Sequence, residues 1–229
     1  ENIYFNNSAT GATMTAGLTN AHSGTSPTQC FVGNITRNVK FIGTSSSLQG
    51  YLLFGPTATV TMSYVEMAFM GSGTANKRGL DIQTTTGASS ITDSALHDFT
   101  AANSFIYFST TTLSNVTFST NVVYSHALGF TIDPTSGTWT MNGNLFMKQS
   151  TTNTLGDVGG TFTNNVISSN SAIGLTVTEA NNLGTFSGNT FQSNASDGWR
   201  VNNNLTTGVT TPWVWTNTTT WRNASWGGT

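Results

Sequence analysis

Charged residues are scarce in this chain of 229 residues, in which Lys, Arg, Asp and Glu together make up only 7%. An average soluble domain has about 25%. The formal net charge is −2 and no basic run occurs, so nucleic acid and anionic membrane surfaces are poor candidate partners. No apolar stretch approaches the roughly 18 residues of a membrane span, so we expect no direct membrane insertion.

Cysteine and helix-forming residues are also in short supply. Cys30 is alone, which excludes an internal disulfide and a thiolate metal cluster. No glycine-rich loop follows an expected strand and opens a helix, so nucleotide binding is unsupported. We therefore expect no cofactor and no metal ion. Thr, Asn, Ser and Gly fill the polar positions, and with 36% hydrophobic residues this composition favours strands, turns and a packed core.

The chain contains a repeat of roughly two dozen residues, a period that is typical of stacked structural repeats. Phe162-Thr-Asn-Asn165-Val-Ile167 returns as Phe186-Ser-Gly-Asn189-Thr-Phe191. Further along, residues 174–177 correspond in the same way to residues 198–201. An apolar residue followed three places later by Asn or Ser marks each unit. These apolar starts are Ile35, Val60, Ile91, Phe118, Trp139, Phe162, Phe186 and Val214.

The repeat predicts an all-β fold, a right-handed parallel β-helix of about eight coils, because short strands of this kind must stack to bury their apolar faces. Residues 34–229 are expected to form the β-helix, as a fragment of a longer chain, and residues 1–33 a lead-in or capping segment. Within one coil, Phe162, Val166, Leu175 and Val177 are expected to point inward. Beneath them we expect the inward residues Phe186, Thr190, Trp199 and Val201.

The recurrent asparagines predict a ladder along one corner of the coil. Stacked amides can each donate to one neighbour and accept from the other, which satisfies buried polar groups. The candidates are Asn121, Asn142, Asn165 and Asn189. The alternative is that asparagine is frequent here because it is common in turns.

Four short strings resemble one family of parallel β-helices, the fibrocystin-like large surface proteins and the cell-surface and secreted hyaluronidases. Asn34-Ile-Thr-Arg-Asn-Val-Lys-Phe-Ile-Gly43 is similar to the family's "LTRN-apolar" strand, and Val65-Glu-Met-Ala-Phe-Met-Gly71 to its "VEF-x-x-MG" segment. Asn121-Val-Val-Tyr-Ser-His-Ala-Leu-Gly-Phe130 resembles its "NVAYD-x-x-GH-x-F" coil, and Thr219-Thr-Trp-Arg-Asn223 its "VWRN" strand. The resemblance implies an extracellular, N-glycosylated β-helix within a larger chain.

The same resemblance argues against hyaluronidase activity. The family's hyaluronan-degrading members carry an "R-x-P-I-H-F-H" strand, and the matching stretch here is Arg78-Gly-Leu-Asp-Ile-Gln83. Asp81 and Gln83 occupy the two histidine positions, whereas Leu80 and Ile82 keep the inward alternation. We therefore expect the fold without the paired imidazoles.

Glycosylation sequons give the best indication of compartment, and they predict an extracellular or cell-surface location. The alternative is that a chain rich in Asn, Ser and Thr produces sequons by chance. Asn217 shares the ladder offset and is expected to be buried, whereas Asn6 stays undecided. The sequons that we expect to be glycosylated are Asn34, Asn115, Asn194, Asn204 and Asn223.

Catalytic candidates are few. His97, Asp98 and His126 could meet on one face and bind a metal or move protons, or each could sit at a turn bonded to the backbone. The acids that could form a glycosidase pair, or simply occupy turns, are Asp81, Asp93, Asp98 and Asp133. The aromatic residues that could stack on sugar rings or fill the core are Trp199, Trp213, Trp215, Trp221 and Trp226.

We interpret the chain as a non-catalytic structural module, a glycosylated β-helix building block of an extracellular coat, stalk or filament. Its expected partners are adjoining segments or copies of the same protein, with carbohydrate as a further candidate. One alternative is a carbohydrate-active enzyme, hyaluronidase-like or a lyase, that acts on an acidic polysaccharide. The other is a viral or bacterial spike or adhesin β-helix.

Overall fold

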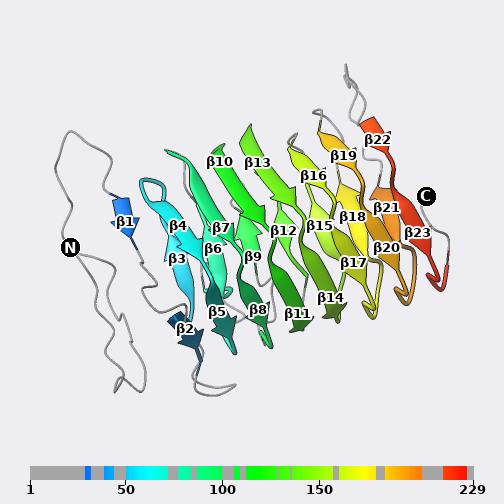
Figure 1. The fold of residues 1–229 in the computed structure, drawn as a ribbon, viewed down its shortest axis with the longest axis horizontal. Helices are drawn as coiled ribbons and strands as arrows, with labels where there is room; N and C mark the ends of the chain where they lie inside the picture. The colour runs from blue at the N-terminus through cyan, green and yellow to red at the C-terminus, as the bar shows by residue number, and fades with distance from the viewer. Residues whose placement is uncertain are drawn as a thin grey trace.

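The computed structural model describes residues 29–31, 39–43, 50–71, 77–83, 87–99, 106–108, 112–127, 129–134, 136–156, 160–178, 184–202 and 214–225. Every regular element in these ranges is a β-strand, and the strands wind into a parallel β-helix (Figure 1). Among the residues described, there is no helix with the length and apolar character needed to cross a bilayer. The all-β solenoid predicted from the repeat is therefore confirmed.

Three sheets run along the column, and every described strand pair is parallel. The first sheet contains β1 (Gln29–Phe31), β4 (Thr59–Ser63), β7 (Ser89–Thr92), β10 (Thr112–Ser119), β13 (Ser136–Asn142), β16 (Thr161–Thr163), β19 (Thr185–Ser187) and β22 (Val214–Thr216). The second contains β2 (Val39–Ile42), β5 (Val65–Ala68), β8 (Ala95–His97), β11 (Val122–His126), β14 (Leu145–Gln149), β17 (Val166–Ser168), β20 (Thr190–Gln192) and β23 (Thr219–Trp221). The third contains β3 (Leu52–Phe54), β6 (Leu80–Ile82), β9 (Ile106–Phe108), β12 (Thr131–Ile132), β15 (Asn153–Leu155), β18 (Leu175–Thr178) and β21 (Trp199–Asn202).

The register of the strands follows the sequence repeat closely in the C-terminal half. Phe162 lies opposite Phe186, and Leu175 lies opposite Trp199. The strand β1, which belongs to the lead-in segment predicted for residues 1–33, pairs with β4 as the first strand of its sheet. The lead-in segment therefore contributes one strand to the column.

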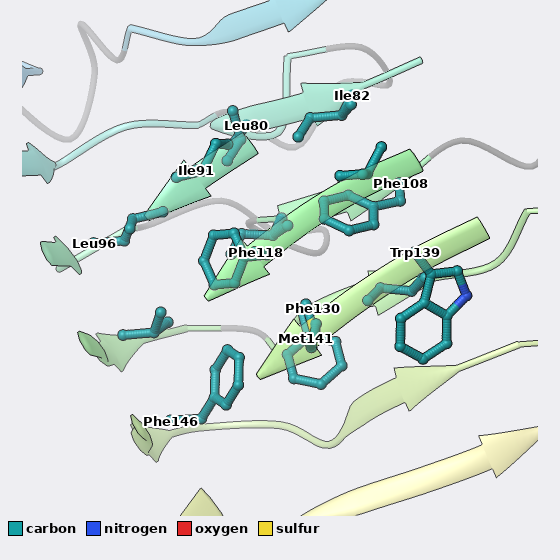
Figure 2. Packing of buried hydrophobic residues seen from close by; sticks show 14 of the residues in the cluster. Leu80, Ile82, Ile91, Leu96, Phe108, Phe118, Phe130, Trp139, Met141 and Phe146 are labelled. Carbon is teal, nitrogen blue, oxygen red and sulfur yellow. The ribbon is translucent and has the colours of Figure 1, made fainter. Parts of the chain in front are cut away.

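A column of large apolar side chains fills the interior behind the first sheet. Aromatic rings stack along it, with centroids 5.2 Å apart between Phe162 and Phe186. Figure 2 shows side chains from different strands meeting in this interior, among them Phe118, Met141 and Phe146. Full burial of such a side chain stabilises the fold by roughly 1.5–3 kcal/mol. The buried residues at this inward position are Met62, Ile91, Phe118, Met141, Phe162 and Phe186.

Two of the expected inward residues face outward instead. Val166 and Thr190 are half-buried, whereas their neighbours Ile167 and Phe191 are fully buried. The alternation of strand side chains is interrupted at the corner before these strands, so it cannot be extended from one strand to the next. The prediction was wrong by one residue for this reason.

The corner after each strand of the first sheet from β4 to β22 begins with a residue in the left-handed conformation. This backbone costs about 1–2 kcal/mol for a residue with a Cβ, which is why glycine occupies two of the positions, with φ of +67° at Gly143 and +65° at Gly188. Non-glycine residues accept the same geometry elsewhere. The remaining left-handed residues of this corner are Tyr64, Asp93, Thr120, Asn164 and Asn217.

The next residue of this corner points inward, and asparagines in this position form a hydrogen-bonded row. The side-chain oxygen of Asn165 accepts from the backbone N–H of Asn144 in the preceding coil at 2.9 Å. Its side-chain NH2 donates to the carbonyl of Met141 at 3.0 Å. Asn121, Asn144 and Asn189 make the same two kinds of bond.

Asn142 does not belong to this row, so the sequence prediction was wrong at that position. Trp139 and Met141 are two residues apart on β13, and both side chains are therefore buried on the inner face. The prediction counted three residues from Trp139, whereas the corner is set by Met141 and reaches Asn144. Asn142 lies on the outer face, where its side chain accepts a hydrogen bond from Thr163.

We expect Asn165→Ala to lower the free energy of unfolding by at least about 1–3 kcal/mol, because it leaves the Asn144 N–H and the Met141 carbonyl without partners inside the column. Urea denaturation measures the change. Asn142→Ala is the matched control, since it removes an amide of the neighbouring coil from the half-buried outer face. Equal losses for the two variants would contradict the assignment of Asn144 and Asn165 to the inner row.

Candidate functional site

His126 lies at the second corner of the coil, between the second and third sheets. From β5 to β23, a left-handed residue lies at the end of each strand of the second sheet, such as Ser125 with φ of +61°, and the next residue points inward. We call these inward residues the second corner row. Its members are Met70, Phe99, His126, Gln149, Asn170, Asn194 and Asn223.

The imidazole of His126 makes the same two hydrogen bonds as an asparagine in this row. Nδ1 accepts from the backbone N–H of Phe99 at 3.3 Å, and Nε2 donates to the carbonyl of Leu96 at 3.0 Å. Asn194 likewise accepts from the N–H of Asn170 and donates to a carbonyl three residues before it. The ring is therefore held neutral in one tautomer, and its position is structural.

Burial dominates the protonation of His126 and lowers its pKa to about 3. The hydrogen bond with the Leu96 carbonyl opposes this change but does not overcome it. A histidine that stays neutral in the core, with both nitrogens bonded to the backbone, is not available to bind a metal or to move a proton. His126 therefore fits the second of the two possibilities raised from the sequence, a histidine at a turn that is bonded to the backbone.

His97 lies on the outer face of the second sheet, between two carboxylates. Nδ1 is 2.8 Å from Asp98 Oδ2, and Nε2 is 3.3 Å from Glu66 Oε1. Lys40 Nζ contacts the other oxygen of Glu66 at 2.5 Å. The Tyr124 ring stacks on the imidazole at 4.8 Å between centroids. His97 and Asp98 therefore meet as a surface cluster, but His126 is not part of it.

Both carboxylates of this cluster are stabilised in their charged form. The hydrogen bond from Lys40 is the main reason that the pKa of Glu66 lies below its usual value. Burial alone would raise the pKa of Asp98, but hydrogen bonds from His97 and Ser125 outweigh it and lower that pKa. Neither acid is tuned to donate a proton near neutral pH, and both nitrogens of His97 already face carboxylates, so the cluster resembles an ion-pair network more than a catalytic one.

The four candidate acids do not come together in pairs. Asp81 lies on the third sheet, fully buried, and its carboxylate binds the Arg78 guanidinium at 2.9 Å. Asp93 lies at the first corner and Asp98 at the second. Asp133 follows β12 of the third sheet. Among the described residues, no group of three or more His, Cys, Asp or Glu side chains is arranged to hold a metal ion.

The stretch Arg78–Gln83, for which the sequence suggested a resemblance to the hyaluronidases, packs its apolar residues into the core. Leu80 and Ile82 are fully buried, as the alternation predicted. Asp81, in place of one histidine, accepts from the Arg78 N–H at 3.0 Å, and the guanidinium of Arg78 lies 3.8 Å from the Tyr107 ring centroid. Gln83 is half-buried and its backbone N–H donates to a carbonyl of the preceding coil. Arg78 and Asp81 hold each other in place.

The tryptophans do not form one described platform. Trp199 packs against the core, and Trp221 is 53% exposed with the Arg222 guanidinium 4.2 Å from its ring. The backbone of Trp215 is in register with Phe186. Trp213 and Trp226 lie outside the described residues.

The structure reverses two of the burial assignments made for the sequons. Asn194 was expected near the surface but is 1% exposed, with its side-chain NH2 bonded to Asn223 at 2.9 Å. Asn217 was expected to be buried in the ladder, yet it is exposed at the first corner. Asn115 is exposed and Asn223 is half-buried. Asn6, Asn34 and Asn204 lie outside the described residues.

Small polar side chains, all with hydroxyl groups except Asn142, form two columns on the outer face of the first sheet, a feature that the sequence did not lead us to expect. In each strand of the first sheet from β4 to β19, one outward polar residue precedes the buried apolar residue and another follows it. Column one consists of Thr61, Ser90, Thr117, Thr140, Thr161 and Thr185. Column two consists of Ser63, Thr92, Ser119, Asn142, Thr163 and Ser187. The signal was the residue on each side of the apolar repeat position.

Comparisons with family models, curated proteins and solved structures give no match for this chain. The geometry shows a parallel β-helix in which inward polar side chains, such as those of Asn165 and His126, bond to the backbone at corners of several described coils. The resemblance to the fibrocystin-like and hyaluronidase family stays a prediction from four short strings.

We expect His126 to make the protein less stable as the pH falls. Its folded pKa of about 3 lies below the usual 6.5, so the unfolded chain takes up a proton first. The contribution is full above about pH 6.5 and declines toward pH 3, by up to about 1.4 kcal/mol per pH unit. Urea denaturation from pH 7.5 to 4 measures the slope.

His126→Asn is the informative variant for this prediction, because asparagine makes the same two backbone bonds elsewhere in the row and does not titrate. The carboxylates titrate in both proteins, so the difference between the two slopes isolates His126. We expect the variant to flatten the curve between pH 6.5 and 5. A slope identical to that of the unmodified protein would contradict the neutral buried imidazole.

Proposed function

We propose that this chain is a non-catalytic structural module, a rigid β-helix that serves as a building block of an extracellular coat, stalk or filament. One observation carries the proposal: the side chains with catalytic potential are engaged in holding the fold. His126 closes a corner, Asp81 binds Arg78, and His97 lies between Glu66 and Asp98.

We infer a right-handed column of about eight coils. Crossovers between parallel strands are right-handed in nearly all known cases. Two of the three sheets contain eight strands each, which supports the count. The row of Asn121, Asn144, Asn165 and Asn189 would act as the ladder that fixes the register between coils. Such a column resists bending, because each coil is bonded to both neighbours along all three sheets.

The proposed partners are further coils of the same kind. The strand β23 lies at the edge of the second sheet in the described part of the chain. Thr220 is in register with the buried Phe191 and yet is exposed. An unpaired strand edge is a template for another strand. A coil stacked on β23 would extend the column and bury Thr220.

The carbohydrate-active alternative is the weaker proposal. It would depend on Glu66, His97 and Asp98, the described cluster that places two acids beside a histidine. The low pKa of both acids removes the general acid that glycoside cleavage needs near neutral pH. Stacking of Tyr124 on His97 further restricts access to the ring.

Self-association tests the structural role. We expect the purified protein to form larger species in sedimentation velocity as its concentration rises, and Thr220→Glu to prevent this by placing a charge between stacked coils. Val122→Glu is the control, since Val122 is 39% exposed on the side of the second sheet. A protein that stays monomeric throughout, or two variants with equal effects, would count against end-to-end stacking.

Glycan occupancy tests the extracellular part of the proposal. We expect glycans at the exposed Asn115 and Asn217 in protein from its native source, because their side chains are accessible at the surface. Asn194 should be unmodified, since a glycan on its NH2 group would replace the bonds to Asn223 and the Ile167 carbonyl. Intact glycopeptide mass spectrometry gives the answer. Full occupancy at Asn194, or none at any site, would contradict this prediction.

A further inference from the structure

The outer face of the first sheet carries a regular grid of hydroxyl groups. Residues of one column are one strand apart, and the two columns are separated by one intervening residue. These intervals correspond to ~4.8 Å along the axis of the column and ~6.6 Å along each strand. The strands run side by side along the column in Figure 1. A grid with two fixed perpendicular repeats can be complementary to a solid with a repeating lattice. A disordered partner has no repeat for the grid to match.

The grid is held rigidly from behind. In every strand of the first sheet from β4 to β19, the residue between the two columns is buried, so the strand is fixed to the core. Seven of the grid positions hold threonine, counted as five in column one and two in column two. Threonine is restricted at χ1 by its branched Cβ, so its hydroxyl and methyl group have few orientations to lose on binding.

The column-one hydroxyl groups are available to a ligand. None of them makes a hydrogen bond to another residue within the described part of the chain, whereas column two is partly bonded to itself. Thr163 donates to Asn142 at 3.0 Å, and Thr216 of β22 donates to Ser187 at 2.8 Å. No described element covers this face, and its residues are half-buried or exposed. Each free hydroxyl can both donate to and accept from a water molecule.

The grid contains no charge. Asp93 follows Thr92 of column two at the first corner, and the Thr120 hydroxyl donates to its carboxyl group at 2.6 Å. The ion pairs of the described residues lie elsewhere, on the second sheet around His97, on the third sheet at Asp81, and where Arg200 meets Asp197. Charged groups hold their own hydration shell, so a face without them can adopt the water order of a neighbouring lattice.

We propose that the outer face of the first sheet binds crystalline water, through the hydroxyl and methyl groups of the two columns. The prism faces of hexagonal ice repeat in two perpendicular directions, one close to the separation of strands and a longer one close to that of alternate residues. Water ordered around each threonine would join the lattice, and the contributions of many weak contacts add along the column. Crystalline polysaccharide is the less favoured occupant, because neither column contains an aromatic ring for stacking on sugars.

This inference rests on the proposed non-catalytic role but not on end-to-end stacking. The test therefore uses the monomeric fraction of the protein, so that its result does not depend on association. A protein that does not associate would count against end-to-end stacking and would leave the present inference unaffected. Thermal hysteresis and ice-crystal shape are measured in a nanolitre osmometer. We expect the unmodified protein to arrest growth between the melting and freezing points and to shape the crystals.

Thr161→Lys, in the middle of column one, should abolish most of the thermal hysteresis by placing a long charged side chain in the grid. Thr190→Lys is the matched control, because Thr190 is a half-buried outward threonine on the second sheet. It should keep the hysteresis of the unmodified protein. Circular dichroism verifies that both variants are folded. Thr117→Lys replaces Thr161→Lys if the latter does not fold.

Three results would overturn the proposal. The first is an unmodified protein that leaves ice growth unchanged. The second is an equal loss of hysteresis in the Thr161→Lys and Thr190→Lys variants. The third is binding to microcrystalline cellulose or chitin that Thr161→Lys removes, in a protein without ice activity, which would assign the grid to a polysaccharide surface.

Discussion

The fold depends on one constraint, the need to satisfy backbone groups at corners that are buried inside the column. At the described corners closed by asparagine, a backbone N–H and a carbonyl face the interior of the column, where an unpaired group costs about 1–3 kcal/mol. An inward side chain from the next coil supplies both partners. Asn165 does so for Asn144 and Met141, and the same arrangement recurs from coil to coil. Stacking and corner closure are therefore the same interaction.

This constraint explains why one position admits such different residues. At the second corner, His126 and Asn194 make equivalent bonds, whereas the side-chain oxygen of Gln149 accepts a hydrogen bond from Asn153, four residues later. The NH2 groups of Gln149 and Asn170 are buried and have no partner in the described residues.

The sequence predicted the solenoid, because an apolar residue and an asparagine recurred at a coil-length period. It did not predict, in every coil, which apolar residue precedes the corner. Trp139 and Met141 are both inward, and nothing in the sequence says which of them precedes the corner. The left-handed residue at each corner also interrupts the alternation, which moved Val166 and Thr190 to the outer face. Among the candidate site residues, the sequence grouped His97, Asp98 and His126, and the structure brings only His97 and Asp98 together. Glu66 and Lys40 were missed, since only the register between β2, β5 and β8 brings them alongside.

A comparison of the outward residues of the first and second sheets distinguishes what the fold requires from what a ligand would require. Threonine favours strands, so its abundance on the first sheet could reflect propensity alone. The second sheet has equally short strands and outward positions, yet its corresponding column holds Lys40, Glu66, Ala95, Val122, Leu145, Val166, Thr190 and Thr219. The same fold thus accepts charged, apolar and hydroxyl residues at outward positions. A face restricted to Thr, Ser and Asn through six strands is more uniform than stability requires, and this uniformity is what a periodic ligand would need.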